Sequence, residues 1–432
     1  MRTNYIYRLF KNSAGVNTDS RRVKRNEIFF ALSGCRHNGN RYAAEAIENG
    51  ALCAVIDDRA YETGKTVVVD DALAELQALA GHHRNVLGIP VLAITGTNGK
   101  TTTKELVASV LSKREKVHFT RGNLNNHIGV PLTILSAPPD TEIMVIEMGA
   151  NHAGEIKQLC SIAQPDYGII TNAGMAHIEG FGSFEGVVRA KTELYEYLGQ
   201  TGGTAIYDDA NLLLAEKIHG MEVRAVPYSS PCDDGRELIT EPYEADIFLK
   251  AVVVYGSEEY VVNTNLFGAC NTENIKAAIA TGLFFNVPMG DAVCAIEEYR
   301  PDNNRSQVKH TGRNTLVCDS YNANPSSMAA AIRSFLKLRA EKKAVILGDM
   351  LELGERAEHE HLHILNEIRS IRPENVFLAG RIFGKVAAGS GYGLFDDAAA
   401  LRSRFEASRP EGFTILIKGS RGTGLEELYD VL

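Results

Sequence analysis

Residues 91–103 read VLAITGTNGKTTT, and this segment is the strongest structural signal in the sequence. Its first five residues form a continuous apolar run, which is typical of a strand buried in a parallel sheet. The glycines that follow let the backbone curl so that successive N–H groups point at phosphate oxygens, and a helix is expected over residues 101–112. A strand, a glycine-rich loop and a helix in this order predict an α/β domain that binds a nucleotide.

Seven consecutive residues of the loop are the expected nucleotide contacts. In such a loop the lysine reaches the β- and γ-phosphates, and the hydroxyl of the next residue binds Mg²⁺. The contacts expected here are Gly96, Thr97, Asn98, Gly99, Lys100, Thr101 and Thr102. Ala93 stands where the longer phosphate-loop pattern has its first glycine. A chance GKT in a turn is the alternative, and the strand and helix on either side argue against it.

The rest of the chain divides at two points. Short strands and helices precede Pro90, which follows a predicted helix. The polar segment RPDNNRSQ, at residues 300–307, ends a second region. Beyond it, TLVCDS, KAVILGD, NVFLAG and TILIKGS predict the strands of another doubly wound, Rossmann-like α/β unit. We therefore predict three domains, comprising residues 1–88, 89–304 and 305–432.

Composition excludes several classes of protein. The 432 residues carry a net charge of -9, which argues against a general nucleic-acid role. Seven scattered cysteines without a C-x-x-C pair argue against a disulfide framework or a structural zinc site. Neither a signal peptide nor an apolar run of about 18 residues is recognisable. We expect a cytoplasmic protein without a membrane span, and a monomer.

The apolar run IMVIEM, at residues 143–148, narrows the kind of nucleotide enzyme. A helicase, a motor or a switch GTPase would usually end a later strand in an acidic cluster, whereas this strand ends in the lone Glu147. The pattern favours an ATP-dependent ligase that activates a carboxylate.

The motif TGTNGKTTT and eight further segments resemble the Mur ligase superfamily. These segments follow one another in the family's order and cover nearly the whole chain. They are GNLNNHIGVPL (122–132), EMGANHAGEI (147–156), NAGMAHIEGFGS (172–183), AKTELYEYL (190–198), NNRSQ (303–307), DSYNANPSSM (319–328), LGDMLELGE (347–355) and KGSRG (418–422). Within the family, they are most similar to the ligases that add D-alanyl-D-alanine to UDP-N-acetylmuramoyl-tripeptide.

The resemblance implies a fold and a reaction. The fold would have an N-terminal domain for the UDP substrate, a central ATPase domain and a C-terminal domain for the dipeptide. The tripeptide's terminal carboxylate would attack the γ-phosphate of ATP, and the dipeptide amine would then attack the acyl phosphate. Such chemistry depends on positioning and charge neutralisation. The pathway implied is peptidoglycan synthesis, which supports cell shape and division.

The resemblance also implies two magnesium sites. Glu147 and Thr101 would hold one Mg²⁺, and a buried carboxylate at a strand end needs such a cation or an ion pair. His177 and a carbamoylated Lys191 would hold the second ion. From its helix alone, Lys191 looks like an exposed lysine with helical charge pairs.

Other site residues are carried over in the same way. Asn271 and Asn274 would contact adenine, although asparagine at a helix start also serves as a cap. Arg305 would clamp the γ-phosphate, and Asp319 would bind the ribose or orient the phosphates. Cys270 replaces the family's usual His or Tyr, and Cys318 replaces the first acid of a DDSYNANP run.

Substrate contacts are expected at both ends of the chain. The NTDSRR segment would bind the diphosphate of the UDP substrate, although a plain surface turn is the alternative. The candidates there are Thr18, Asp19, Ser20 and Arg21, with Asn125 and Asn126 near the muramoyl group. The candidates for the dipeptide are Asn322, Asn324, Lys418, Ser420 and Arg421. Thr423 stands where the family usually has Met.

Two rival functions remain. One is another amide ligase of the superfamily, such as folylpolyglutamate synthase, against which SYNANP and LGDMLELGE argue. The other is a catalytically inactive relative that only binds ligands, against which Lys100, Glu147 and Lys191 argue. Whether the tripeptide ends in diaminopimelate or lysine stays open.

Overall fold

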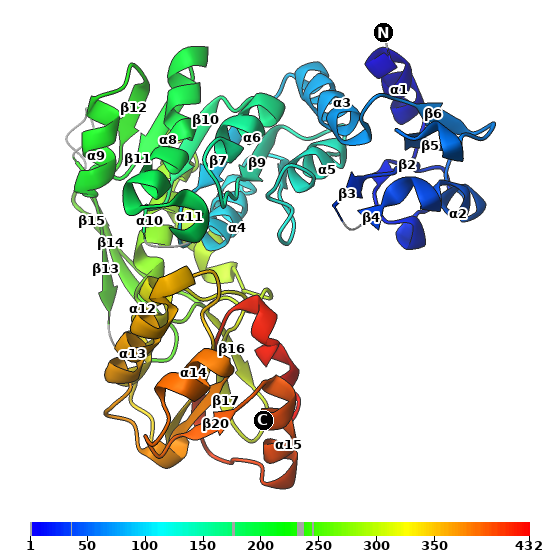
Figure 1. Cartoon of the computed structure of the whole chain (residues 1–432). Helices are drawn as coiled ribbons and strands as arrows, with labels where there is room; N and C mark the ends of the chain where they lie inside the picture. The colour runs from blue at the N-terminus through cyan, green and yellow to red at the C-terminus, as the bar shows by residue number, and fades with distance from the viewer. Residues whose placement is uncertain (1, 36, 175–177, 231–236, 244–245) are drawn as a thin grey trace.

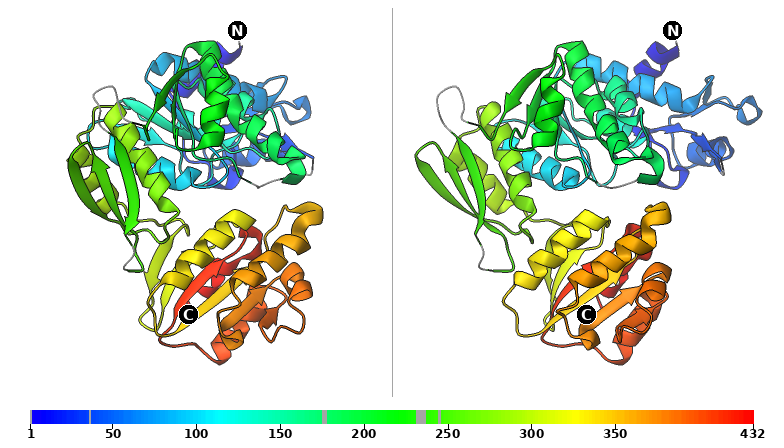
Figure 2. Two further views of the ribbon diagram at one scale, coloured as in Figure 1. Left: turned by 90° about the vertical axis from the view of Figure 1, so that its left-hand side faces the viewer. Right: turned by 60° about the vertical axis from the view of Figure 1, so that its left-hand side comes forward.

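The structure is a computed structural model that describes residues 2–35, 37–174, 178–230, 237–243 and 246–432. Three α/β units follow one another along the chain (Figure 1). The first two lie side by side, and the third lies below the second (Figures 1 and 2). No helix among the described residues is long and apolar enough to cross a membrane.

The N-terminal unit is a small parallel sheet with helices on both faces. Its strands run in the order β1-β2-β5-β6. The alternate residues of β2 point to opposite faces, so Ile28 and Phe30 join one apolar cluster while Phe29 joins another. The elements are α1 (Arg2–Lys11), β1 (Val16–Asn17), β2 (Ile28–Phe30), the hairpin of β3 (Ser33–Gly34) and β4 (His37–Asn38), α2 (Ala43–Glu48), β5 (Cys53–Ile56), β6 (Thr66–Val68) and α3 (Ala72–Leu87).

The central unit is a six-stranded parallel sheet in the order β12-β11-β10-β7-β9-β8. Its strands are β7 (Val91–Thr95), β8 (Val117–Phe119), β9 (Ile143–Glu147), β10 (Tyr167–Ile170), β11 (Thr204–Tyr207) and β12 (Arg224–Pro227). Every residue of β7 and β9 is buried, as their continuous apolar sequences predict. Because β7 lies between β9 and β10, the loop after it is at the point where the sheet is extended in both directions, which is where open α/β sheets bind ligands.

Helices and a three-stranded antiparallel sheet complete the central unit. The helices are α4 (Lys100–Leu111), α5 (Gly129–Leu135), α6 (Glu155–Ala163), α7 (Ile178–Phe181), α8 (Phe184–Thr201), α9 (Leu212–His219), α10 (Asn271–Phe284) and α11 (Met289–Glu298). The antiparallel strands are β13 (Leu238–Tyr243), β14 (Lys250–Tyr255) and β15 (Glu258–Asn263). The expected helix over residues 101–112 is confirmed, one residue earlier at each end.

The C-terminal unit is the predicted second doubly wound sheet, in the order β16-β17-β21-β18-β19-β20. Only the edge strand β16 is antiparallel. The strands are β16 (Gln307–His310), β17 (Thr315–Asp319), β18 (Lys343–Gly348), β19 (Val376–Ala379), β20 (Gly393–Phe395) and β21 (Thr414–Lys418). The helices are α12 (Pro325–Lys337), α13 (Ala357–Glu367), α14 (Arg381–Val386) and α15 (Ala398–Ala407).

Helix α3 joins the first two units. Leu76 and Leu79 lie in one buried cluster with residues of both sheets. Near the end of the helix, the buried Arg84 guanidinium donates to the carbonyl of Gln164 at 3.0 Å and to Asp166 Oδ2 at 2.7 Å. Asp166 also accepts the N–H of Val91 at 2.9 Å, at the start of β7. We propose that the boundary between the first two domains lies between residues 88 and 89, and that α3 packs against both of them. We propose the second domain boundary between residues 304 and 305.

Candidate nucleotide and ligase site

Two glycines of the loop after β7 cannot be replaced without a clash. Gly96 has a φ of 143°, and a Cβ there would lie 2.0 Å from Thr171 Oγ1. Gly99 has a φ of 79°, and a Cβ there would lie 2.4 Å from Asn274 Oδ1. Only glycine fits both the backbone conformation and the space. The loop therefore has the curled shape that the sequence predicts.

Lys100 begins α4 and folds back over this loop. Its Nζ donates to the carbonyls of Gly96 at 2.8 Å and Thr97 at 2.9 Å. Burial lowers the pKa of Lys100 to about 8, although the charge of Glu147 acts in the opposite direction. A cation that burial destabilises in this way gains most from an added anion, and a phosphate of ATP would supply that charge.

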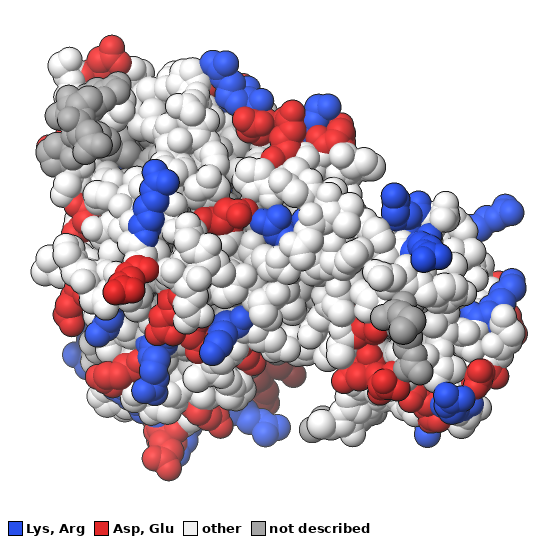
Figure 3. All heavy atoms as spheres, turned by 90° about the horizontal axis from the view of Figure 1, so that it is seen from above, with Lys and Arg blue, Asp and Glu red and all other residues white. Residues whose placement is uncertain are grey.

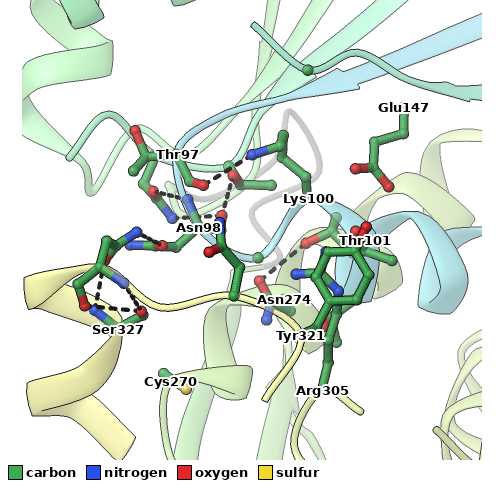
Figure 4. A pocket seen from close by; sticks show the side chains of 18 of the residues that line it. Thr97, Asn98, Lys100, Thr101, Glu147, Cys270, Asn274, Arg305, Tyr321 and Ser327 are labelled. Carbon is green, nitrogen blue, oxygen red and sulfur yellow. Dashed lines mark hydrogen bonds between the residues drawn. The ribbon is translucent and has the colours of Figure 1, made fainter. Parts of the chain in front are cut away.

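Glu147 ends β9 with its carboxylate buried. Its Oε1 accepts the Asn125 Nδ2–H at 2.8 Å, whereas Oε2 is buried without a hydrogen-bond partner among the described residues. Figure 4 shows this carboxylate on the same side of the loop as Lys100 and Thr101. A buried unpaired carboxylate oxygen is costly, so the site suits a divalent cation with oxygen ligands.

Lys191 is buried, so the interpretation of it as an exposed helical lysine is wrong. Only 2% of the residue is exposed, and its Nζ donates to the carbonyl of Ala150 at 3.4 Å. Burial, followed by the charge of Lys100, lowers the pKa of Lys191 to about 7. His177, its expected partner, lies outside the described residues.

The sequence held a signal for this burial. Lys191 lies three or four residues from Val187, Val188, Leu194 and Tyr195, which are all buried. That spacing places it on the apolar face of α8. The expected charge pairing on this helix is also different, because Glu193 accepts the backbone N–H groups of Gly154 at 2.6 Å and Lys157 at 2.9 Å.

The two asparagines expected at adenine are buried and bonded to one another. Asn271 Nδ2 donates to the carbonyl of Phe267 at 2.8 Å, and Asn274 Nδ2 donates to Asn271 Oδ1 at 2.9 Å. Thr103 Oγ1 donates to Asn274 Oδ1 at 3.0 Å. The amides thus tie α10 to the phosphate-loop helix α4. Both residues still line the site cavity, as does the exposed Cys270.

The connection to the C-terminal unit holds an arginine over the site. Asn304 and Ser306 have φ values of 56° and 49°, a left-handed conformation that is uncommon outside glycine. Between them, the guanidinium of Arg305 lies 3.8 Å from the centre of the Tyr321 ring, and its Nε has no partner among the described residues (Figure 4). Tyr321 belongs to the DSYNANP motif, yet no local pattern predicts this stacking.

The ends of β17 and β21 bring an ion pair to the same place. These strands are parallel neighbours, so Asp319 and Lys418 are paired in register. Lys418 Nζ donates to Asp319 Oδ2 at 2.5 Å, and Asp319 Oδ1 accepts the N–H of Ser306 at 3.1 Å. The charge of Lys418 is therefore neutralised by Asp319 in this arrangement, and Lys418 is already paired before any substrate carboxylate binds.

The phosphate loop also contacts the C-terminal unit directly. Asn98 Nδ2 donates to Ser326 Oγ at 3.0 Å, and Asn324 Nδ2 donates to Asn98 Oδ1 at 2.7 Å. Asn324 is also the N-cap of α12, because it accepts the N–H of Ser327 at 2.9 Å. The expected nucleotide and dipeptide residues therefore meet at this junction.

A cavity of about 660 Å³ collects most of the predicted site. Its lining includes the loop from Thr97 to Thr102 and the predicted residues Asn125, Asn126, Glu147, Asn271, Asn274, Arg305, Asp319, Asn322, Asn324 and Lys418. Sequence reasoning missed other lining residues, among them Tyr321, Asn151, Glu155, Asp208 and Glu273. Tyr321, Asn151 and Glu155 lie within the quoted segments DSYNANPSSM and EMGANHAGEI, whereas Asp208 and Glu273 lie outside every quoted segment.

The predicted UDP residues lie outside this lining, on the N-terminal unit. There Arg21 donates to Asp19 through Nε at 2.9 Å and through Nη2 at 3.0 Å, and Ser20 Oγ donates to Glu45 at 3.3 Å. Thr18 directly precedes Asp19 in this segment. The predicted dipeptide residues Ser420 and Arg421 follow β21 and also lie outside the lining. Lys191 is likewise not part of the cavity lining.

The molecular surface carries both signs of charge. On the face shown in Figure 3, Lys and Arg side chains lie among Asp and Glu side chains. The described residues of that face thus form a mixed surface, unlike the basic stripe that is typical of proteins that bind nucleic acids.

The comparisons with known proteins agree with this architecture. The family models called Mur ligase family, catalytic domain; Mur ligase middle domain; and Mur ligase, glutamate ligase domain match residues 12–95, 94–282 and 304–421. A UDP-N-acetylmuramoyl-tripeptide--D-alanyl-D-alanine ligase of Bacillus subtilis is 34% identical over 96% of this chain and 92% of its own.

The chain belongs to the Mur ligase family.

Other members of the family extend the comparison. The ligase of the same name from Escherichia coli is 30% identical over 96% of this Mur ligase and 93% of its own chain. A crystal structure of MurF from Acinetobacter baumannii superposes with a TM-score of 0.82 at 29% identity, covering 96% of this chain and 92% of that one. MurF of Thermotoga maritima in complex with ADP shares the fold, with a TM-score of 0.84 at 24% identity over 98% and 97% of the two chains.

Proposed function

We propose that this Mur ligase joins D-alanyl-D-alanine to UDP-N-acetylmuramoyl-tripeptide, using ATP and giving UDP-N-acetylmuramoyl-pentapeptide, ADP and phosphate. One observation carries the proposal: a single cavity places Lys100 of the phosphate loop opposite Asn322, Asn324 and Lys418 of the DSYNANP and KGSRG segments. The lysine proposed to bind phosphate and the unit proposed to bind the dipeptide therefore line the same cavity. The relatives at 34% and 30% identity are named for this activity.

The reaction proceeds in two transfers. A carboxylate oxygen of the tripeptide attacks the γ-phosphorus of ATP, the bond to the β-phosphate oxygen breaks, and ADP leaves with that electron pair. The amine nitrogen of the dipeptide then attacks the acyl carbon and loses a proton, and phosphate leaves with the electrons of the C–O bond. The loop N–H groups, Lys100 and Arg305 neutralise the charge that builds up on the phosphate oxygens.

Magnesium would be held by residues whose chemistry fits it. The unpaired Oε2 of Glu147 and the hydroxyl of Thr101 would hold the first ion beside the nucleotide. A second ion would be held by His177 and a carbamoylated Lys191. When bound, such ions neutralise the negative charges that must approach one another.

Carbamoylation of Lys191 is supported by its surroundings. The ammonium group first loses a proton; the neutral amine nitrogen then attacks the carbon of CO₂ and loses a second proton, so the side chain changes from cationic to anionic. An amine with a pKa of about 7 is neutral in a large fraction of molecules near neutral pH. Burial also disfavours the ammonium, which has one long hydrogen bond, to the carbonyl of Ala150, so a carbamate neutralised by a metal ion would remove a cost from the fold.

The remaining assignments follow the three units. The N-terminal unit would bind the UDP substrate through Thr18, Asp19, Ser20 and Arg21, with Asn125 and Asn126 at the muramoyl end. Asn271 and Asn274 would border the adenine, and Asp319 the ribose or the phosphates. The dipeptide would bind near Asn322, Asn324, Lys418, Ser420 and Arg421. We place the enzyme in the cytoplasm, as a monomer, in the synthesis of the peptidoglycan precursor.

A substrate panel tests the proposed function. Phosphate release should require UDP-N-acetylmuramoyl-tripeptide, D-alanyl-D-alanine and ATP together, because the acyl phosphate is consumed only by the matching amine. Glutamate, meso-diaminopimelate or L-alanine in place of the dipeptide should give little phosphate.

Two results of the panel would contradict the proposal. A robust rate with a folate and glutamate would favour folylpolyglutamate synthase, whose structure from Mycobacterium tuberculosis shares the fold at 14% identity and a TM-score of 0.61. No phosphate with any combination, in a protein that still binds ADP, would favour an inactive ligand-binding relative.

A further inference from the structure

A second lysine of the phosphate-loop helix is buried completely. Lys104 lies one turn after Lys100 in α4, and none of its surface is exposed. Burying an ammonium group costs several kcal/mol unless its donors are satisfied. Lys104 does not line the nucleotide cavity, so its burial needs another explanation.

The partners of Lys104 connect α4 to the neighbouring strands. Its Nζ donates to the carbonyl of Thr120 at 2.6 Å, directly after β8, and to Glu105 Oε1 at 2.7 Å. The same Nζ lies 5.4 Å from the centre of the Phe119 ring. A charged donor on a backbone carbonyl is stronger than a neutral one, so this contact fixes Thr120 relative to the helix.

Thr120 in turn holds the residue that ends β9. Thr120 is fully buried, and its Oγ1 accepts the N–H of Glu147 at 3.0 Å. Its own N–H donates to the carbonyl of Val145 at 3.1 Å. Through its carbonyl and its hydroxyl, Thr120 thus links Lys104 on the helix to the backbone N–H of Glu147.

These hydrogen bonds affect the relative positions of the two residues proposed to bind Mg²⁺. The first turn of α4 carries Thr101, and β9 carries Glu147, whose Oε2 is buried and unpaired. These two side chains come from different elements, so something must set the spacing between them. The hydrogen bonds from Lys104 to Thr120 and from Glu147 to Thr120 connect these two elements.

We propose that Lys104 is a positioning residue that, through Thr120, holds Glu147 at the spacing from Thr101 that a nucleotide-bound divalent cation requires. The inference rests on the proposed function only in taking the ligand to be a magnesium nucleotide. Groups that orient metal ligands commonly contribute about 10-fold or more to metal affinity. Lys104 therefore acts on metal-dependent nucleotide binding rather than on nucleotide binding as such.

Calorimetric titration of the full-length enzyme with ADP, with and without Mg²⁺, tests this role. Lys104→Met keeps the length of the side chain and removes its donors, while Thr120→Val removes the hydroxyl that Glu147 uses. Each should reduce the Mg²⁺-dependent gain in ADP affinity about 10-fold, with metal-free ADP affinity changed less than about 2-fold. Thr120→Ser keeps the hydroxyl and should retain the gain.

Lys113→Met is the matched control, because Lys113 lies just beyond α4 and pairs with the exposed Glu298 at 2.7 Å. In this variant, the Mg²⁺-dependent gain in ADP affinity should equal that of the wild type. The proposal is overturned if folded Lys104→Met keeps the wild-type gain, which would make Lys104 a stabilising residue only. Should Lys104→Met not fold, equal gains in Thr120→Val and Thr120→Ser overturn it instead. The substrate panel is read separately, so a failure of the proposed function would be distinguishable.

Discussion

Lys100→Met is expected to reduce phosphate release about 10³-fold, because it removes the half-buried cation that would face the transferred phosphate. Its Nζ is held on the carbonyls of Gly96 and Thr97, so the charge is already in place before the nucleotide binds. The measurement is steady-state phosphate release with all three substrates at saturation. Binding of the UDP substrate should persist, since its predicted diphosphate contacts, Thr18, Asp19, Ser20 and Arg21, lie on the N-terminal unit.

The control for this variant is Lys116→Met. Lys116 is exposed and pairs with the exposed Asp140 at 3.1 Å, so its loss should leave the rate within about 2-fold of the wild type. A near-normal rate for Lys100→Met would mean that the loop after β7 does not bind the reacting phosphate.

Lys191→Ala is expected to reduce activity about 10²-fold or more, because it removes the nitrogen that carries the proposed carbamate. Lys191→Arg should be equally inactive, since guanidinium stays cationic and cannot be carbamoylated. A short carboxylic acid in solution should restore part of the rate to Lys191→Ala by supplying the missing anion. Folding should survive, because a buried ammonium held by one long hydrogen bond, to the carbonyl of Ala150, is no net gain to the fold.

Carbamoylation of Lys191 should become easier as the pH rises through about 7, because only the neutral amine reacts with CO₂. Its pKa is lowered to about 7, so the amine is mostly neutral above that pH and mostly protonated below it. Enzyme stripped of CO₂ should therefore regain activity with added bicarbonate readily at pH 8 and poorly at pH 6. The exposed Lys157 provides a matched control, and Lys157→Ala should behave like the wild type. Full activity of Lys191→Arg would mean that the second metal site uses other ligands.

The sequence predicts the parts of this site that depend on local patterns. The glycine-rich loop, the strand ending in Glu147 and the doubly wound C-terminal unit are each visible in consecutive residues, because strand burial and backbone conformation are set locally. Contacts set by strand register are harder to predict. Asp319 and Lys418 are far apart in the chain and become partners only because β17 and β21 are neighbours. No spacing rule in the sequence reveals that pairing.

Contacts between units are the least predictable features. The stacking of Arg305 on Tyr321 depends on two left-handed residues that are not glycine, and the bonds from Asn98 to Asn324 and Ser326 depend on how two units meet. The burial of Lys191 lies between these cases. Its apolar spacing on α8 was readable, although a charged residue is usually assigned to the exposed face.

Transfer of ¹⁸O to phosphate shows whether ATP activates the tripeptide's own carboxylate. The measurement uses UDP-N-acetylmuramoyl-tripeptide labelled with ¹⁸O in the terminal carboxylate, together with D-alanyl-D-alanine and ATP, and analyses the released phosphate by mass spectrometry. An acyl phosphate keeps one carboxylate oxygen on phosphorus when the amine attacks carbon, so we expect one ¹⁸O in each phosphate. Ligated product accompanied by phosphate without ¹⁸O would contradict it.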